Sequence, residues 1–361
     1  MSQNSAVWMI TGASSGFGKA ISLEVLRRGH RVIATARNLE SLGEIKTMGA
    51  YTMSLDVTAS VSDISEKINA AVKEHGPITH LVNSAGYMLE EVLGQFDTNL
   101  FGTIKVIQAV PPRMREAVTD FPKVIANFGS TASWTGWPSS SVYCSSKWTI
   151  SGLTEGLAAE VAPFGIKAIV IEPGTFRTRF LGKACGSRQS AGCHLPAYQK
   201  TRETVNYYMD LTHNTQLGDA EKGACAIVDV LTLTGVAKDK EIPVRLPIGS
   251  DSVEVIGTKC TGTIELLGMW DAIIKSTDGK ASCEEDKRSG SGVRASITGC
   301  RGVLRRSSRF PVGERGFQDL VDLEGEMLRR EASVERISLG IDAEWSCLQM
   351  EVLSPGGRGL A

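Results

Sequence analysis

The chain has 361 residues, of which 42% are hydrophobic and 22% are charged, so it holds enough apolar material for a full core. Its 39 basic residues are balanced by 40 acidic ones, which excludes the strongly basic surface that non-specific nucleic-acid binding requires. The apolar runs, such as 6–10 and 168–171, are far shorter than the roughly 20 residues that cross a bilayer. No charged segment leads into a hydrophobic stretch at the N-terminus, and the eight cysteines show no metal-ligand spacing. We expect a cytoplasmic protein that binds neither membranes nor nucleic acids and contains no metal.

Short β-rich segments alternate with helical patterns over the first 280 residues, as they do in βαβ units. Strands are expected at 7–11, 31–35, 51–55, 80–83, 123–128, 167–172 and 244–247. Helices are expected at 16–28, 61–75, 92–117, 142–162 and 219–233. The pattern predicts an α/β fold of the Rossmann type, with a doubly wound parallel sheet of about seven strands and helices on both faces.

Composition divides the chain near residue 280. Residues 1–280 contain 16 Lys and 11 Arg, whereas residues 281–361 contain 1 Lys and 11 Arg. We predict one folded domain over 1–280 and an atypical, disordered C-terminal extension over 281–361. Within the domain, 176–218 has clusters of Gly, Ser and Pro and reads as a loop with short helices; a connection of that length is usually a lid over a binding site.

A glycine-rich turn follows the first expected strand and leads into the first helix. Glycine permits the tight turn and lets a diphosphate approach the free N–H groups and the positive end of the helix. An ordinary steric turn also collects glycine, but the strand-turn-helix setting favours a dinucleotide site. Its members would be Gly12, Ser14, Ser15, Gly16, Phe17 and Gly18.

Two further positions extend the nucleotide interpretation. The second strand is followed by Ala36 and Arg37, with no carboxylate for a ribose 2'-hydroxyl, and the guanidinium suits a 2'-phosphate. NADP(H) is therefore preferred to NAD(H), with a solvated surface arginine as the alternative. After the third strand, Asp56 could accept a hydrogen bond from the adenine amino group or form a simple turn.

Tyr143 and Lys147 lie one helical turn apart in the expected helix 142–162. An ammonium on that face would lower the pKa of the phenol from about 10 toward the working pH, which a general acid or base requires. Ser130 follows the strand 123–128 and could donate to a substrate carbonyl, although a serine at a strand end is often only a cap.

Over residues 7 to 270 the chain resembles the short-chain dehydrogenase/reductases, a family of single-domain NADP(H)- or NAD(H)-dependent enzymes, and Ser15 favours the single-domain branch over the extended one. Six motifs carry the resemblance in the family's order: the glycine turn, Asn83-Ser84-Ala85-Gly86, Asn99, Ser130, Tyr143 with Lys147, and Pro173-Gly174.

The resemblance implies a role for each matching residue. Tyr143 would pass the proton to or from the substrate oxygen, Lys147 would lower the pKa of Tyr143 and hold the nicotinamide ribose, and Ser130 would polarise the carbonyl. Asn99 would fix a water that links Lys147 to solvent. The remaining implied cofactor contacts are Asn83, Ala85, Gly86, Pro173, Gly174, Phe176 and Thr178.

We therefore expect an NADP(H)-dependent oxidoreductase that interconverts a ketone and a secondary alcohol on a small or medium apolar molecule. The segment 32–37 is similar to fungal members of the family, which makes a tailoring step on a terpenoid or polyketide the expected setting. Homodimers or homotetramers are what the resemblance implies. The substrate wall is expected among the aromatic residues Trp137, Phe176, Phe180, Tyr198, Tyr207 and Tyr208, with core packing as the alternative for each.

Two departures from the family keep a second hypothesis open. Only 15 residues separate Asn83 from Asn99, a shorter span than the family's, so the helix before Asn99 is expected to be truncated. The extension 281–361 has no counterpart in the family. The alternative is a catalytically silent NADP(H)-binding protein that acts through partners.

Overall fold

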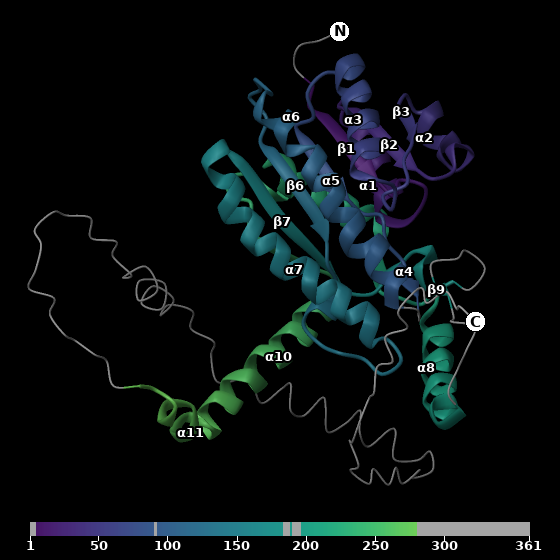
Figure 1. Cartoon of the computed structure of the whole chain (residues 1–361). Coiled ribbons are helices and arrows are strands. Elements are labelled where there is room, and N and C mark those ends of the chain that lie inside the picture. The colour runs from purple at the N-terminus through teal and green to yellow at the C-terminus, as the bar shows by residue number, and fades with distance from the viewer. Residues whose placement is uncertain (1–4, 90–91, 183–187, 190–195, 280–361) are drawn as a thin grey trace, which may run out of the picture. The chain divides into compact units, whose positions relative to one another are not determined.

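The computed structural model describes residues 5–89, 92–182, 188–189 and 196–279 (Figure 1). The predicted extension 281–361 lies outside these ranges. All neighbouring strands of the main sheet are parallel, in the order β11-β7-β6-β4-β1-β2-β3. The strands are β1 (Val7–Thr11), β2 (Arg31–Ala36), β3 (Tyr51–Ser54), β4 (His80–Asn83), β6 (Lys123–Phe128), β7 (Ile166–Pro173) and β11 (Arg245–Ile248). The expected doubly wound parallel sheet is confirmed.

The sheet separates two hydrophobic cores because successive side chains of a strand point to opposite faces. In β1, Trp8 and Ile10 belong to one core, while Val7 and Met9 belong to the other. Every residue of β1 is buried. A strand covered on both faces carries a continuous apolar run, which makes it recognisable in the sequence.

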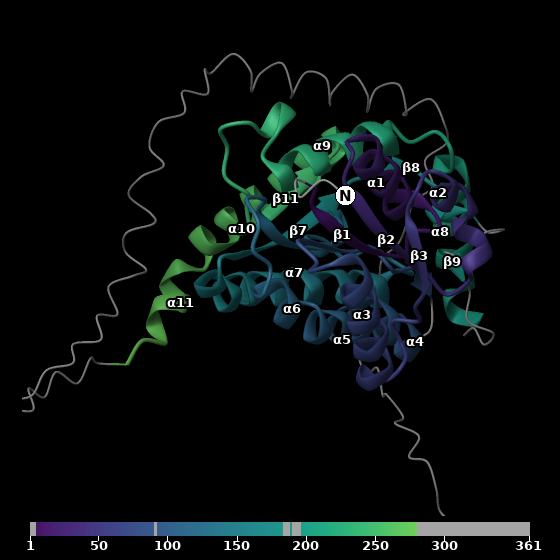
Figure 2. The ribbon, with the colours of Figure 1, turned by 90° about the horizontal axis from the view of Figure 1, so that it is seen from above.

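Helices cover both faces of the sheet, as Figure 2 shows. On one face, α1 (Gly16–Arg27) and α9 (Ala220–Thr232) pack over the Trp8 core. On the other, α3 (Val61–His75), α5 (Thr103–Ala109) and α7 (Ser141–Val161) pack over the Met9 core. These helices are amphipathic or deeply buried, so the sequence pattern predicted α1, α3, α7 and α9 closely.

The expected single helix 92–117 is instead divided. It comprises α4 (Val92–Phe96), a π-helical segment (Asp97–Gly102), α5 and α6 (Pro111–Arg115). The wider π turn brings Gly102 against the loop that follows β3, where a Cβ would lie only 2.6 Å from the Val57 side chain. Helices widened in this way often occur at functional sites.

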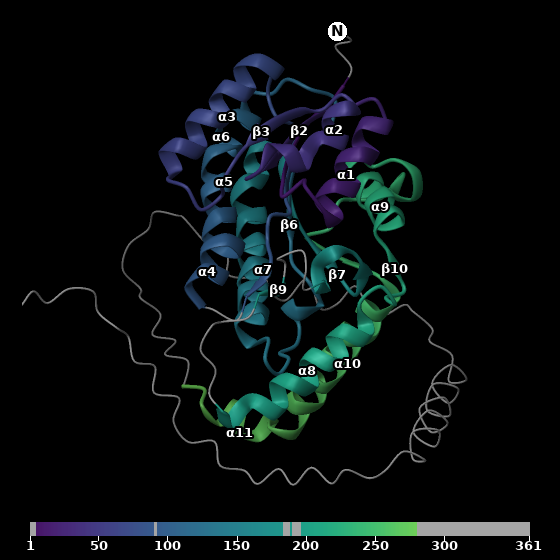
Figure 3. The same ribbon diagram turned by 90° about the vertical axis from the view of Figure 1, so that its right-hand side faces the viewer.

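Three helices were not predicted: α2 (Gly43–Thr47), α10 (Ser250–Met269) and α11 (Asp271–Ser276). A fourth, α8 (Gln199–Thr212), is a 14-residue helix within the segment expected to hold only short ones. Figures 1 and 3 place α8 and the start of α10 beyond the carboxyl ends of the strands. None of the helices in the described ranges has the length and hydropathy that crossing a bilayer requires.

The segment 176–219 begins and ends at one small sheet. β8 (Phe176–Arg177) pairs in parallel with β10 (Gly218–Asp219), and the Arg177 guanidinium lies 3.7 Å from the Asp219 carboxylate. The two ends of the segment are therefore held side by side. Between them, β9 (Arg188–Gln189) pairs with β5 (Met88–Leu89).

An ion-pair network joins α1 to α9. The Arg28 guanidinium donates to Asp229 at 2.7 Å and to Glu24 at 2.6 Å, and Arg27 also donates to Glu24 at 2.7 Å. Hydrogen bonds from Arg27 and Arg28 lower the pKa of Glu24 to about 2, although burial opposes them.

Replacing Glu24 by glutamine should lower the free energy of unfolding at pH 7 by about 1–2 kcal/mol, because two guanidiniums lose a charged acceptor. A lowered folded pKa means that ionised Glu24 stabilises the protein above pH 4.5 and that this contribution is lost as the pH falls toward 2. Urea unfolding at pH 7, 4 and 3 should show the difference from wild type shrinking with acid. Glu66→Gln, at an exposed site of α3, is the control, and an equal effect there would contradict the assignment.

Candidate active site

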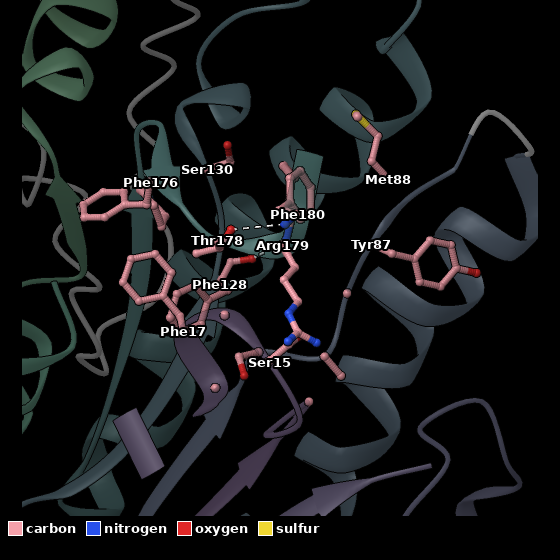
Figure 4. Close-up of a pocket in the computed structure, with 18 of the residues that line it drawn as sticks. Ser15, Phe17, Tyr87, Met88, Phe128, Ser130, Phe176, Thr178, Arg179 and Phe180 are labelled. Carbon is pink, nitrogen blue, oxygen red and sulfur yellow. Dashed lines mark hydrogen bonds between the residues drawn. The ribbon is translucent and has the colours of Figure 1, made fainter. Parts of the chain in front are cut away.

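A cavity of about 400 Å³ lies at the carboxyl ends of β1, β4, β6 and β7 (Figure 4). Residues from distant parts of the sequence meet there because parallel strands end at one edge of the sheet. The expected site residues that line it are Gly12, Ser14, Ser15, Gly16, Phe17, Gly18, Arg37, Asp56, Ala85, Gly86, Ser130, Tyr143, Lys147, Pro173, Gly174, Phe176 and Thr178.

Asn83 and Asn99 do not line this cavity, and both are buried. The Asn83 amide donates to Asn127 at 2.9 Å, so it ties β4 to β6 rather than facing a cofactor. The Asn99 side chain accepts from the backbone N–H of Tyr87 at 3.1 Å and donates to its carbonyl at 3.0 Å. A Cβ placed on Gly86 would lie 3.1 Å from the side-chain oxygen of Asn99 and 3.9 Å from the amine of Lys147. Asn99 thus holds the backbone of the loop beside Lys147.

The glycine turn approaches the end of β4 more closely than any side chain would allow. Gly12 has φ +66°, and a Cβ there would lie 2.7 Å from the Ala85 Cα. A Cβ on Gly18 would collide with the Gly12 carbonyl oxygen. The backbone N–H of Ala85 donates to the Thr11 hydroxyl at 3.2 Å, which fixes the turn against β4.

The N-terminus of α1 faces the cavity with its donors uncapped. Ser15 occupies the capping position, but its hydroxyl makes no capping hydrogen bond, and the first turn carries no acidic residue. The free N–H groups and the positive end of the helix dipole therefore point into the cavity, beside glycines that leave room for a ligand. This arrangement fits a phosphate-bearing group, which is the chemistry that the glycine turn predicted.

Arg37 and Asp56 lie at the ends of the next two strands. Asp56 accepts from the backbone N–H of Thr58 at 2.9 Å and from its hydroxyl at 2.8 Å, as a turn-forming aspartate does. Burial raises the pKa of Asp56, but these hydrogen bonds and the charges of Arg37 and Lys105 outweigh burial and lower it. Arg37 is exposed and leaves its guanidinium available at the cavity.

The loop after β6 is locked to α7 by a capping box. The Ser130 hydroxyl accepts from the N–H of Ala132 at 3.1 Å, and the Ser133 hydroxyl accepts from the N–H of Ser130 at 3.3 Å. The Ser133 hydroxyl donates in turn to the Lys147 carbonyl at 2.9 Å. Ser130 therefore caps the short helix that follows it, which is the structural role that the sequence analysis kept as an alternative. The same hydrogen bonds fix the position of Ser130 relative to α7, the helix that carries Tyr143.

Tyr143 and Lys147 face the cavity from α7 and are both buried, with exposed fractions of 6% and 8%. The Lys147 amine donates to the Phe128 carbonyl at 2.7 Å and lies 5.8 Å from the centre of the Tyr143 ring. Burial lowers the pKa of Lys147 to about 8. Burial also raises the pKa of Tyr143, and hydrogen bonding with Ser130 only partly opposes the rise. The pKa of Tyr143 therefore shifts upward, opposite to the expected lowering, because burial is the largest influence on it.

A buried carboxylate that the sequence analysis missed joins three of these elements. Glu172, at the end of β7, accepts from the Ser151 hydroxyl of α7 at 2.9 Å and from the Trp134 indole at 2.9 Å. Arg245 of β11 donates to it at 2.7 Å. The network holds the Ser130 loop, α7 and the Pro173 turn at fixed spacing. In the sequence, only its position next to Pro173 could have indicated that Glu172 belongs to the site.

The remaining wall of the cavity is apolar. Tyr143 packs in a cluster with Met88, Phe180, Leu181 and Met209. Figure 4 shows a second group, in which the ring of Phe17 lies 5.4 Å from Phe128 and 4.9 Å from Phe176 between ring centres. Of the other aromatic candidates, only Trp137 lines the cavity. Tyr198, Tyr207 and Tyr208 lie outside it and are more than 60% exposed, so they were wrongly expected there.

Gly12→Ala should destabilise the fold by about 2–4 kcal/mol, since the substitution forces a left-handed backbone and a clash with Ala85. Thermal unfolding would measure the loss. Gly152→Ala is the matched control: it lies exposed within α7 with open space at its Cβ and should be neutral or stabilising by up to about 1 kcal/mol. Equal effects of the two changes would refute the close approach.

Lys147→Met should raise the free energy of unfolding at pH 7 by about 2 kcal/mol, because it removes a buried charge. The unfolded chain keeps the Lys147 proton up to pH 10.5 and the folded chain releases it near 8, so wild-type stability rises between these values. The advantage of the variant should therefore shrink from pH 8 to 10.5 in denaturant titrations. Lys73→Met, at an exposed site of α3, should show no such trend; a pH-independent gain at Lys147 would contradict the lowered pKa.

Comparisons with known proteins agree with this geometry. The sequence profile described as "short chain dehydrogenase" matches residues 6–187. "Oxidoreductase claN" of Passalora fulva is 40% identical over 189 residues, which cover 49% of this chain and 84% of that protein. "Oxidoreductase BOA17" of Botryotinia fuckeliana is 32% identical over 263 residues, covering 70% and 91%.

Solved structures give the same result. A short-chain dehydrogenase from Streptomyces avermitilis superposes with a TM-score of 0.67 at 31% identity and covers 77% of this chain and 100% of that one. Serine dehydrogenase, in a closed form complexed with NADP+, superposes with a TM-score of 0.54 at 27% identity and covers 67% and 94%. The motifs, the strand order and these matches together show that the chain belongs to the short-chain dehydrogenase family.

Proposed function

We propose that the protein is an NADP(H)-dependent oxidoreductase that interconverts a ketone and a secondary alcohol on a small or medium apolar molecule. The proposal rests on one observation: an uncapped helix N-terminus and the Ser130, Tyr143 and Lys147 side chains line the same cavity. The first suits the phosphates of a dinucleotide, and the others suit proton transfer to a carbonyl oxygen.

Three features support NADP(H) as the cofactor. The turn carries glycine at positions 12, 16 and 18, which leaves room for a diphosphate, and β2 is followed by Arg37 instead of an acidic residue. Two family members of similar fold, serine dehydrogenase and ElxO, were solved with NADP bound. When bound, the nicotinamide gives or takes the hydride, and the protein supplies position and electrostatics.

The chain's own residues would handle the proton and the substrate oxygen. The Tyr143 phenol, kept protonated by its raised pKa, can donate to an oxygen on which negative charge develops. Ser130 would donate to the same oxygen, and Lys147, charged below pH 8, would stabilise the phenolate left behind. Asn99 would order a water beside Lys147 for reprotonation.

The apolar wall of Met88, Phe180, Leu181 and Met209 supports an apolar substrate. We also propose a tailoring step in fungal terpenoid or polyketide metabolism, supported by this wall and by the similarity to two fungal oxidoreductases. Three expectations from the sequence stay predictions: assembly as a homodimer or homotetramer, a cytoplasmic location, and the domain boundary near residue 280 with 176–218 as lid.

Tyr143→Phe should lower carbonyl reduction with NADPH by about 100-fold or more, the usual contribution of a general acid, while NADP+ binding is retained. A panel of apolar ketones and secondary alcohols, assayed with NADPH and NADP+, would measure it. Tyr208→Phe, on the exposed face of α8, should leave turnover unchanged.

Retained turnover in Tyr143→Phe would defeat the mechanism. Tight NADP+ binding by the wild-type chain with no turnover on any carbonyl would instead favour the silent cofactor-binding protein.

A further inference from the structure

Arg179 is a cation in the cavity that the site described above does not use. It opens the single-turn helix η5 (Arg179–Leu181), and its side chain is exposed. The guanidinium makes no hydrogen bond or ion pair with any residue in the described ranges. Figure 4 shows it extending from η5 toward the turn that carries Ser15, and both residues line the same cavity.

The backbone beside Arg179 is fixed over the glycine turn. Thr178 lies 3.8 Å from the point where a Cβ of Gly16 would stand. Its hydroxyl accepts from the N–H of Phe180 at 3.2 Å, which caps η5. The arginine side chain therefore starts from an anchored position, next in sequence to a residue that contacts the N-terminus of α1.

The charge of the cavity favours an anion at this place. Asp56 is the single acidic residue among the described residues that line it, and its Oδ1 is engaged by Thr58. Arg37, Lys147 and Arg179 supply three positive side chains, and the α1 N-terminus adds its dipole. Among the described residues, no carboxylate pairs with Arg179 beside that N-terminus.

We propose that Arg179 binds the diphosphate of the dinucleotide, opposite the N–H groups of α1. A planar guanidinium can donate two parallel hydrogen bonds to phosphate oxygens. This inference rests on the proposed function and assigns two arginines to different phosphates of the cofactor. Arg179 recognises the diphosphate that NAD(H) and NADP(H) share, whereas Arg37 recognises the 2'-phosphate that only NADP(H) carries.

The test measures binding rather than turnover. Titration calorimetry would give the Kd for NADP+ and for NAD+ of the wild-type chain and of three variants. Arg179→Ala should raise the Kd for both ligands by the same factor, about tenfold. That factor corresponds to the low end of the contribution of a hydrogen bond to a charged group, as expected at an exposed site. Arg37→Ala should weaken NADP+ alone. Arg177→Ala is the matched control, because Arg177 lies two residues earlier and outside the cavity, and it should change neither Kd.

Two additional measurements exclude a loss of folding. Thermal unfolding of Arg179→Ala without ligand should match wild type. Adenosine 2'-monophosphate, which has no diphosphate, should bind wild type and Arg179→Ala equally. Arg179→Lys should recover part of the lost affinity, since it restores the charge without the bidentate geometry.

Unchanged affinity of Arg179→Ala for both dinucleotides would overturn the inference and leave the proposed function standing. So would unchanged dinucleotide affinity with a raised KM for an anionic substrate, which would assign Arg179 to the substrate instead. Failure of the wild-type chain to bind either dinucleotide would overturn the proposed function itself and this inference with it.

Discussion

The contact between the first loop and the end of β4 positions everything else at the site. Gly12 and Ala85 touch backbone to backbone, and this closeness aims the N-terminus of α1 across the edge of the sheet. A methyl group would separate the two, moving the helix donors away from the loop that Asn99 holds beside Lys147. The part of the cavity that would bind the diphosphate and the part that holds Tyr143 and Lys147 are adjacent because the Gly12 and Ala85 backbones meet between them.

Elements with a strong local signal were predictable from the sequence, and the others were not. β1 is an unbroken apolar run before a glycine turn, and α3 has an N-terminal Ser60 cap and a clear apolar face, so both were placed to the residue. In α10 the chain is rich in Thr and Gly, begins after Gly249 without a side-chain cap, and buries only Ser252, so nothing marked it as helical. α8 has no buried residue and a mostly polar sequence, so its apolar face gave only a weak signal.

The same distinction applies within the site. Tyr143 and Lys147 are four residues apart, and that spacing alone assigns them to one face of a helix. Side-chain direction carries no such signal: Asn83 turns toward β6, and Glu172 is a hub because of partners that are distant in sequence. The sign of the Tyr143 pKa shift also depends on how deeply the phenol is buried, which residue spacing does not encode.

The pairing of β8 with β10 has a consequence for how this protein could diversify. Since Phe176 lies opposite Gly218 and Arg177 opposite Asp219, the stretch between them begins and ends at one point of the domain. Insertions, deletions or wholesale exchange of that stretch need not disturb the register of the main sheet. Selectivity could therefore be engineered by changing the apolar wall of Phe180, Leu181 and Met209 within this stretch, provided that Thr178 and Arg179 on the cofactor side are kept.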